Sequence, residues 1–235
     1  MPENENTRLR SAYQRRWEKG SDRRHSFFHR DVLLRIHQQE KILLKFLART
    51  IGTNLADKRL LDVGCGTGPV LLAMLRYGFQ PQNCFGIDPL PEQIEHAKKR
   101  FPNITFACCS AENIPFEKNS FHLVTLFTCL SSILDSDIRR TVCRQAFDAL
   151  RPGGWLIIYD FRVNNPSNPD VQAVTFKELI DYFPHADRIS KTLTLAPPLA
   201  RRIARFSMPL CSALTALPFL RTHRLTAFQK PSLHP

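Results

Sequence analysis

The stretch Leu60-Leu61-Asp62-Val63-Gly64-Cys65-Gly66-Thr67-Gly68 decides the fold of this 235-residue chain. Residues 60–63 have the apolar pattern of a short buried strand, and three of the chain's nine glycines follow within five residues. Pro69 then opens a helical pattern that ends before Gly78. Glycine permits the unusual backbone angles of a sharp turn and lets a ligand approach the backbone. The stretch therefore predicts a strand, a ligand-binding turn and a helix.

Outward from this stretch, strand and helix patterns alternate. Strands are expected at 83–87, 104–109, 121–127 and 155–161, and helices at 91–101 and 137–150. Such alternation predicts right-handed βαβ units and a mainly parallel sheet. After residue 161 the alternation weakens, with a helix expected at 174–182 and two further strands at 190–195 and 225–228.

The acidic residues around the glycine loop indicate which ligand it takes. The loop reads G-x-G-x-G, whereas a dinucleotide loop reads G-x-G-x-x-G, and no G-K-[ST] follows as in a P-loop. Asp62 stands two residues before the first glycine and suits a cationic amino-acid group. Asp88 ends the next strand and suits two ribose hydroxyls, and residues 110–116 follow the third strand and suit an adenine. These three sites together describe S-adenosylmethionine.

With these motifs in place, the sequence resembles the class I S-adenosylmethionine-dependent methyltransferases, in particular the small ubiquinone-methylating type. The resemblance covers about residues 58–162 through LLDVGCGTG, GIDPLPEQIEHAKKRF, CCSAENIPFEKNSFHLV and AFDALRPGGWLIIYDF. It implies a Rossmann-like, doubly wound α/β fold whose seven-stranded sheet is mainly parallel with an antiparallel last strand. It also implies eleven cofactor-binding residues: Asp62, Gly64, Cys65, Gly66 and Gly68 at the methionine end, Asp88 and Pro89 at the ribose, Ala111 and Glu112 at the adenine, and Phe127 and Thr128 facing the methyl group.

Two positions depart from the family's usual pattern. Ser110 stands where the family often has aspartate, and His122 stands in FHLV where the family often has FDLV. A serine hydroxyl still donates to or accepts from adenine.

Methyl transfer from a sulfonium is an in-line displacement, so alignment of the reacting atoms and exclusion of water do much of the catalysis. A general base is needed only for a protonated, weakly acidic nucleophile. The sequence therefore assigns no catalytic base, and it predicts no metal site. The candidates near the acceptor are Cys129, Ser131, Tyr159 and Arg162 at the ends of the fourth and fifth strands, and His25, His29 and His37 in the N-terminal cap. Tyr13, a further substrate candidate, and Arg15 are placed by the resemblance at the methionine end of the cofactor.

The net charge of +12 is concentrated at the two ends of the chain. Residues 1–50 carry 12 Lys/Arg and 6 Asp/Glu, residues 51–184 carry 13 and 14, and residues 185–235 carry 8 and 1. Basic flanks suit an anionic partner such as a phosphorylated substrate, an anionic membrane surface or nucleic acid, or are simply solvated. We expect residues 1–50 to form a helical N-terminal cap over the cofactor, and residues 51–235 to form the methyltransferase domain.

The segment at about 198–220 is expected to be a helical insertion between the last two strands. Leu199, Ile203, Phe206, Leu210 and Leu214 are expected to share one apolar face beside three arginines. This face packs on the sheet edge, covers the active site, or lies in a membrane interface with its arginines at lipid phosphates. The stretch TLAPPLARRIA…LPFLRTH resembles the tails of bacterial methyltransferases associated with cell-surface glycan assembly.

The remaining features narrow the function class. No apolar run reaches the roughly 18 residues of a membrane span, the first residues lack the apolar stretch of a signal peptide, and the seven cysteines contain no C-x-x-C pair, so a cytoplasmic protein is expected. The fourth strand is not followed by the N/D-P-P-Y/F motif of adenine or glutamine N-methylating enzymes, and no RNA-binding module is evident. We expect O-methylation of a small molecule or of a glycan- or lipid-linked intermediate; an inactive cofactor-binding module and an RNA methyltransferase are the alternatives.

Overall fold

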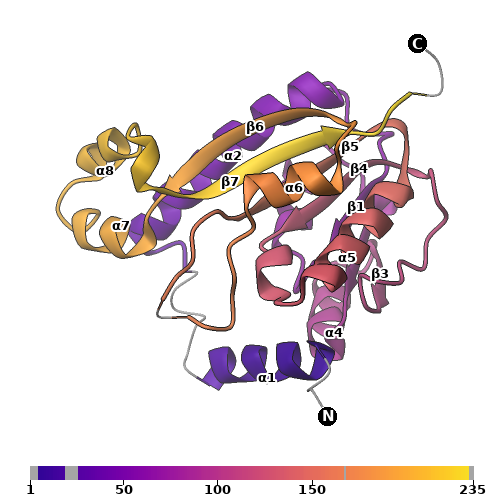
Figure 1. Ribbon diagram of the computed structural model, residues 1–235, viewed down its shortest axis with the longest axis horizontal. Helices are drawn as coiled ribbons and strands as arrows, with labels where there is room; N and C mark the ends of the chain where they lie inside the picture. The colour runs from indigo at the N-terminus through magenta and orange to yellow at the C-terminus, as the bar shows by residue number, and fades with distance from the viewer. Residues whose placement is uncertain (1–4, 19–25, 167, 233–235) are drawn as a thin grey trace.

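A seven-stranded sheet forms the centre of the computed structural model, which describes residues 5–18, 26–166 and 168–232 (Figure 1). The order of the strands is β3-β2-β1-β4-β5-β7-β6. Each neighbouring pair is parallel except the two that involve β7, which runs antiparallel to both β5 and β6. The expected doubly wound sheet with an antiparallel last strand is therefore confirmed. The strands are β1 (Leu60–Val63), β2 (Cys84–Asp88), β3 (Thr105–Cys108), β4 (Phe121–Phe127), β5 (Leu150–Phe161), β6 (Asp187–Leu195) and β7 (Arg221–Gln229).

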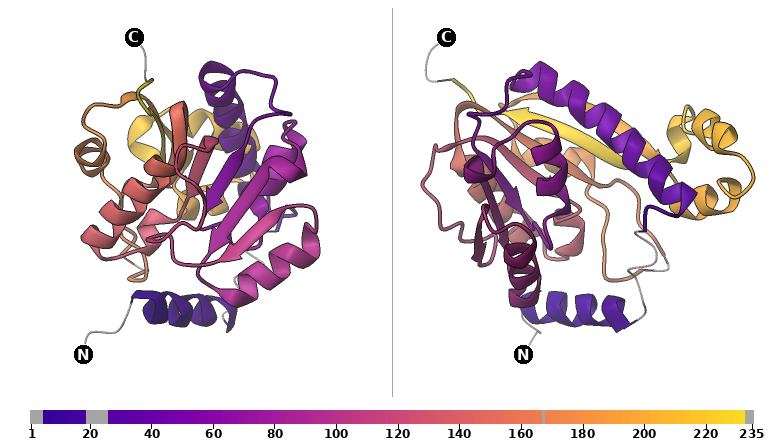
Figure 2. Two further views of the ribbon diagram at one scale, coloured as in Figure 1. Left: turned by 90° about the vertical axis from the view of Figure 1, so that its right-hand side faces the viewer. Right: turned by 180° about the vertical axis from the view of Figure 1, so that it is seen from behind.

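Helices cover both faces of the sheet, and one helix lies across the carboxyl ends of its parallel strands (Figures 1 and 2). The α-helices are α1 (Glu5–Glu18), α2 (Arg30–Thr50), α3 (Pro69–Arg76), α4 (Pro91–Arg100), α5 (Ser136–Ala149), α6 (Phe176–Tyr182), α7 (Pro197–Ile203) and α8 (Met208–Leu214). Single 3-10 turns occupy Pro81–Asn83, Leu130–Ser132 and Pro218–Leu220. Residues 1–4, which hold part of the expected cap, and His25 lie outside the described residues.

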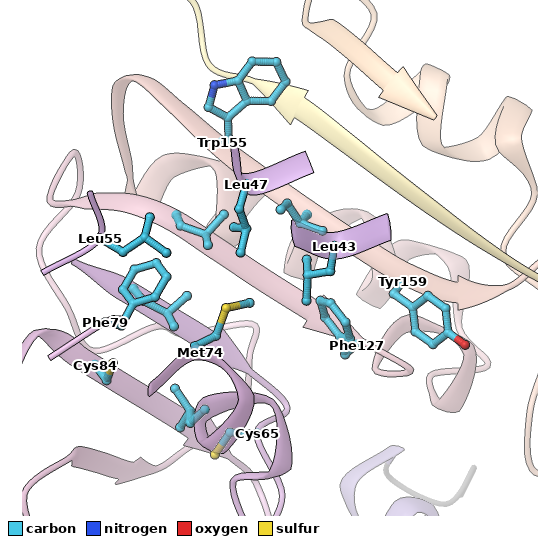
Figure 3. Packing of buried hydrophobic residues seen from close by; sticks show 14 of the residues in the cluster. Leu43, Leu47, Leu55, Cys65, Met74, Phe79, Cys84, Phe127, Trp155 and Tyr159 are labelled. Atoms are coloured by element: carbon cyan, nitrogen blue, oxygen red, sulfur yellow. The ribbon is translucent and has the colours of Figure 1, made fainter. Parts of the chain in front are cut away.

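The sheet is buried on both faces, as a parallel sheet requires. On one face α2, α3 and α4 contribute Leu47, Met74 and Ala97 to a single apolar cluster with β1, β4 and β5 (Figure 3). On the other face α5 and α6 pack against the same strands. Because Leu43, Phe46 and Leu47 of α2 lie in this core, α2 is a layer of the domain.

Helix α1 lies across the carboxyl ends of the parallel strands (Figures 1 and 2). Glu5 accepts a hydrogen bond from the Leu134 N–H at 2.9 Å, and Arg8 donates to the Ser132 carbonyl. At its other end, Arg15 pairs with Asp170 at 2.8 Å. These bonds join α1 to the segments that follow β4 and β5.

The segment between β6 and β7 differs from the expected single apolar face. It forms two short helices, because Ser207 interrupts the pattern, caps the Leu210 N–H and precedes Pro209 in the first turn of α8. The side chains of Leu199, Ile203 and Leu214 pack against a small core, whereas Phe206 and Leu210 are exposed. The prediction of one shared apolar face is therefore wrong.

Candidate functional site

The strand order places the candidate site at the switch point of the sheet. From β1 the chain proceeds to β2 and β3 on one side and then crosses to β4 on the other side. Ligands of doubly wound sheets bind at such a point, outside the carboxyl ends of the strands. The glycine loop, Asp88 and the loop after β3 follow the neighbouring strands β1, β2 and β3, so the structure brings these predicted residues to one edge.

The glycine loop makes a tight turn between β1 and α3. Gly64, Gly66 and Gly68 all have positive φ, at 74°, 51° and 85°. A Cβ on Gly64 would lie 2.8 Å from the Cys129 sulfur, and one on Gly68 would lie 2.9 Å from the Phe101 ring. A Cβ on Gly66 would meet only the Gln93 side-chain oxygen, at 3.8 Å. Gly64 and Gly68 are therefore required by packing, while Gly66 presents open backbone.

Asp62 is a buried carboxylate with one oxygen committed and one free. Its Oδ1 accepts a 2.7 Å hydrogen bond from the Thr125 hydroxyl on β4, while its Oδ2 is buried and has no partner among the described residues. Burial raises the pKa of Asp62 to about 7, against the lowering effect of the Thr125 hydrogen bond. A buried acceptor without a donor is costly, so this oxygen is suited to a cationic ligand group.

Asp88 holds the glycine loop against the end of β2. Its Oδ2 accepts from the Gly66 N–H at 2.9 Å and its Oδ1 accepts from the Leu90 N–H at 3.0 Å. Burial raises the pKa of Asp88, and these two backbone hydrogen bonds oppose the rise. Each carboxylate oxygen has a second acceptor position, so Asp88 can hold the loop and still accept ligand hydroxyls.

The loop after β3 is a short turn held by a serine. The Ser110 hydroxyl accepts from the Glu112 N–H at 3.3 Å and bonds to the Glu112 carboxylate at 3.1 Å. Ala111 and Glu112 are half-buried beside this turn. Pro89, also half-buried, lies next to it, because its carbonyl accepts from the Cys108 thiol at 3.8 Å.

The end of β4 packs against the glycine loop. Phe127 is buried, while Thr128 is exposed with a positive φ of 51°. The Thr128 N–H donates to the Tyr159 carbonyl at 2.7 Å. Cys129 contacts Gly64, and burial raises the pKa of its thiol well above the usual value. Cys129 is therefore a neutral packing group at neutral pH.

Two other acceptor candidates are engaged in the fold. The Tyr159 hydroxyl is buried and hydrogen bonded to Thr194 at 2.8 Å, and burial raises its pKa to about 12. Arg162 donates to the Arg221 carbonyl at 2.8 Å and thereby joins the end of β5 to the start of β7. Ser131 is buried beside Asp160, whose carboxylate accepts from the Ser131 N–H at 3.0 Å. Tyr159 and Arg162 therefore have structural partners for their side chains, whereas the Ser131 hydroxyl oxygen is buried with no hydrogen-bond partner among the described residues.

The N-terminal candidates divide between α1 and α2. Tyr13 is half-buried and Arg15 is exposed on α1, which crosses the carboxyl edge. His29 and His37 are exposed at the start of α2 and on its surface. His122, at the start of β4, accepts from the Arg59 N–H at 3.1 Å at the opposite edge of the sheet.

Sequence reasoning missed three residues that shape the site: Thr125, Gln93 and Glu5. Thr125 could have been noticed in the sequence, because it is a hydroxyl residue within the apolar strand FHLVTLF. In the structure it pairs in register with Asp62. Gln93 and Glu5 left no such signal in the sequence, since each acts only after α4 and α1 are packed beside the loop. Among the described residues, no group of three or more His, Cys, Asp or Glu side chains is placed to hold a metal ion, and no helix is long and apolar enough to cross a membrane.

Comparison with known proteins agrees with this geometry. Residues 60–154 match the family described as a methyltransferase domain. The chain is 24% identical over 138 residues to the ubiquinone/menaquinone biosynthesis C-methyltransferase of Campylobacter jejuni, covering 57% of this chain and 54% of the relative. It is 34% identical over 109 residues to the demethylmenaquinone methyltransferase of Tropheryma whipplei, covering 45% and 43%. The chain thus spans about half the length of the curated relatives it matches.

A solved structure shows the same fold over most of the chain. The geranyl diphosphate C-methyltransferase of Streptomyces coelicolor, in complex with S-adenosylhomocysteine, superimposes with a TM-score of 0.61 at 16% identity, covering 88% of this chain and 85% of that one. This likeness shows the shared fold, and the family match shows that residues 60–154 carry a methyltransferase domain.

Proposed function

We propose that the carboxyl edge of β1, β2 and β3 binds S-adenosylmethionine and that the chain transfers its methyl group to a small molecule or to a glycan- or lipid-linked intermediate. The observation that carries the proposal is the unpartnered, buried Oδ2 of Asp62 beside the open backbone of Gly66. An ammonium group would supply the missing donor, and Asp88 would accept from ribose hydroxyls. When bound, the cofactor supplies an electrophilic methyl group on a positively charged sulfur.

The remaining cofactor contacts follow from the neighbouring loops. Gly64, Cys65 and Gly68 shape the turn, Pro89 flanks the ribose position, and Ala111 and Glu112 flank the adenine position. Phe127 and Thr128 close the end of β4 next to the methyl group. This assignment is a proposal for each residue, supported by their shared position at the carboxyl edge.

The chain contributes to methyl transfer mainly by alignment and by exclusion of water. α1 crosses the edge and is held at both ends, so it is placed to cover a bound substrate. Cys129 and Tyr159 stay protonated at neutral pH because burial raises the pKa of each. Neither is a base, which favours an acceptor that is acidic or becomes nucleophilic by desolvation.

The proposed acceptor class is supported by the basic charge at the two ends of the chain and by the names of the compared proteins. Their names include demethylmenaquinone and geranyl diphosphate as acceptors, which are amphiphilic molecules like a lipid-linked intermediate. We propose an oxygen acceptor, although two of these proteins are named as C-methyltransferases. Analysis of the bond that carries the methyl label in the product decides between oxygen and carbon.

Calorimetry and a transfer assay test the proposal in two steps. We expect saturable binding of both S-adenosylmethionine and S-adenosylhomocysteine, and transfer of labelled methyl to lipid and glycan extracts. Asp88→Ala should weaken binding by about 1–3 kcal/mol because a charged acceptor is lost, while the exposed Asp181→Asn serves as the matched control. No binding at high micromolar concentrations contradicts the proposal.

Two outcomes would favour the alternatives. Binding without transfer to any acceptor pool favours a cofactor-binding module that lacks catalysis. Label in RNA, with an RNA affinity that falls steeply with salt, favours an RNA methyltransferase.

A further inference from the structure

Helices α7 and α8, the helical pair, expose large apolar side chains together with the 3-10 turn at Pro218–Leu220. Phe206 is 88% exposed and Phe219 is 76% exposed, with Leu210 at 49% and Leu217 at 40%. Four of the eight large apolar side chains that are exposed in the described part of the chain therefore lie within fourteen residues. Two more, Phe27 and Phe28, directly precede α2, whose first turns lie beside α7 (Figures 1 and 2).

The segment that carries the exposed side chains is itself packed against the domain. Ala200, Ala204 and Cys211 are buried against Leu34 of α2 and Leu195 of β6. Polar contacts hold the end of α8, where Gln38 donates to the Thr215 hydroxyl at 2.8 Å and Arg221 donates to the Thr215 carbonyl at 2.7 Å. The phenylalanines therefore project from a packed element, and their exposure is not explained by lack of structure in the segment that carries them.

The charged residues of the segment that carries these side chains are all basic. Arg201, Arg202 and Arg205 are exposed, and none of the three pairs with an acid among the described residues. No aspartate or glutamate occurs between residues 188 and 235. Asp31 on α2 lies close to Cys211 of α8, because burial and then the Asp31 charge raise the pKa of the Cys211 thiol. The surface thus combines aromatic anchors with uncompensated positive charge.

We propose that this surface docks on an anionic lipid bilayer. Phenylalanine and leucine side chains enter the acyl boundary while arginines remain at lipid phosphates, which is how interfacial elements bind. Each of the two helices has seven residues, so they are suited to lie in the interface. A protein partner would cover the aromatic side chains equally well, but three uncompensated arginines complement an anionic lipid surface without any specific acidic partner.

The position of this surface gives docking a consequence for the proposed function. The helical pair follows the carboxyl end of β6, which runs in the same direction as β5, so the pair and the glycine loop both follow carboxyl ends of strands; in Figure 1 the pair projects to the left, above and apart from α1. A docked molecule would therefore hold its cofactor edge near the bilayer, where a lipid-linked acceptor resides. Only this step rests on the proposed methyl transfer; docking itself is independent of it.

Sedimentation with vesicles tests docking without any methyl transfer. We expect the chain to bind vesicles of phosphatidylglycerol and phosphatidylcholine at least tenfold more tightly than vesicles of phosphatidylcholine alone. The double variant Phe206→Ser/Phe219→Ser should lose about tenfold or more in binding, because both apolar anchors are lost. The triple variant Arg201→Gln/Arg202→Gln/Arg205→Gln should lose about a hundredfold in binding, because each basic residue near an anionic surface contributes about fivefold.

Matched controls on the outer face of α2 make the test specific. Leu44→Ser removes another exposed apolar side chain, and Lys41→Gln/Lys45→Gln/Arg49→Gln removes three other exposed charges. Both controls should bind the vesicles as the unmodified chain does. Equal losses in the controls, or equal binding to neutral and anionic vesicles, would overturn the proposal.

A tryptophan at position 206 reports directly whether this surface enters the bilayer. Phe206→Trp fluorescence should be quenched by brominated acyl chains in anionic vesicles, and Leu44→Trp fluorescence should not. Concentration-dependent dimerisation that the Phe206→Ser/Phe219→Ser variant abolishes, without quenching, would identify a second copy of the chain as the occupant and overturn the proposal. Normal S-adenosylhomocysteine binding by the non-docking variants would show that failure of docking and failure of the proposed function are separate results.

Discussion

At the scale of single residues, the site depends on a carboxylate that the fold holds at a cost. Asp62 is fully enclosed, bonded to Thr125 on one oxygen and unpartnered on the other. Burial raises its pKa from 3.8 to about 7. Between these two values the unfolded chain has released a proton that the folded chain retains, so the contribution of this group to stability declines as pH rises through this window. A cationic ligand would reverse that cost.

The Asp62→Asn variant measures the cost of burying this carboxylate in the absence of ligand. We expect the ligand-free variant to be more stable than the unmodified chain at pH 8 by about 1–2 kcal/mol, because no ionised carboxylate is buried. The gain should disappear at pH 5, where Asp62 of the folded chain is protonated. Urea unfolding at the two pH values measures both terms; a stability loss at pH 8 would contradict the assigned burial cost.

Cofactor affinity should depend on pH through the same group. A protonated Asp62 no longer attracts an ammonium group, so S-adenosylhomocysteine affinity should fall by up to about tenfold per pH unit below 7. Asp62→Asn should bind weakly and show little change with pH. Calorimetric titration between pH 5.5 and 8 measures the affinity of both proteins. A parallel decline in the unmodified chain and in Asp62→Asn would show that another group causes the pH dependence.

The glycine loop permits a matched test of packing against backbone strain. Gly52 has a φ of 86° with nothing within 4 Å of an added Cβ, whereas Gly64 has a φ of 74° and a Cβ there would contact the Cys129 sulfur. We expect Gly52→Ala to cost about 1–2 kcal/mol in unfolding free energy from strain alone. Gly64→Ala should cost a further 1–3 kcal/mol, roughly, from overpacking. Equal losses would show that Cys129 gives way.

The site residues on consecutive loops were predictable because their spacing is local. Asp62 lies in β1 and Asp88 ends β2, and the three glycines that follow β1 permit the tight turn into α3. Thr125, which holds Asp62, became apparent only when β1 and β4 were seen in register. The partners of Tyr159 and Arg162, on β6 and β7, were not predictable because they come from strands that are distant in sequence.

At the scale of elements, α1 lies across the carboxyl ends of the parallel strands, with Ala12 buried. Glu5, Arg8 and Arg15 bond it to the segments after β4 and β5. Burial raises the pKa of Glu5, but the Arg8 side chain and the Leu134 N–H outweigh this and lower it overall. Glu5 is therefore ionised at neutral pH and fixes the start of α1 to the loop after β4.

Glu5→Ala should release α1 without unfolding the domain. We expect faster amide hydrogen exchange in residues 8–18 and at Leu134, with unchanged exchange in β1 and β4, because a helix that loses bonds to the domain opens locally more often. Arg10→Ala, an exposed position on the same helix, is the control. If Glu5→Ala leaves the exchange of α1 unchanged, these bonds do not hold it.

The α7–α8 segment shows where pattern reading fails at this scale. The apolar spacing from Leu199 to Leu214 is helical throughout, so one continuous face is the natural prediction. Ser207 and Pro209 start a second helix instead, because a serine cap and a proline in the first turn favour a helix start. The break turns Phe206 and Leu210 outward, away from the face that packs on Leu34.

At the scale of the whole molecule, the sheet was predictable and the covering of its edge was not. Alternating strands and helices restrict the chain to a doubly wound sheet, as the order β3-β2-β1-β4-β5-β7-β6 confirms. The prediction of one helical cap over residues 1–50 does not hold for α2, which enters the core through Leu43, Phe46 and Leu47, whereas α1 crosses the carboxyl ends of the strands (Figure 1). Their roles depend on contacts with β5, β6 and the loop after β4, which are remote in sequence.

The central claim is that Asp62 and Asp88 hold opposite ends of one cofactor, and a crystal structure with S-adenosylhomocysteine tests it most directly. The account predicts the amino group within hydrogen-bond distance of Asp62 Oδ2 and the ribose hydroxyls within hydrogen-bond distance of Asp88. A ligand bound elsewhere, or an Asp88 carboxylate that turns away from the sugar while still holding Gly66, would contradict it.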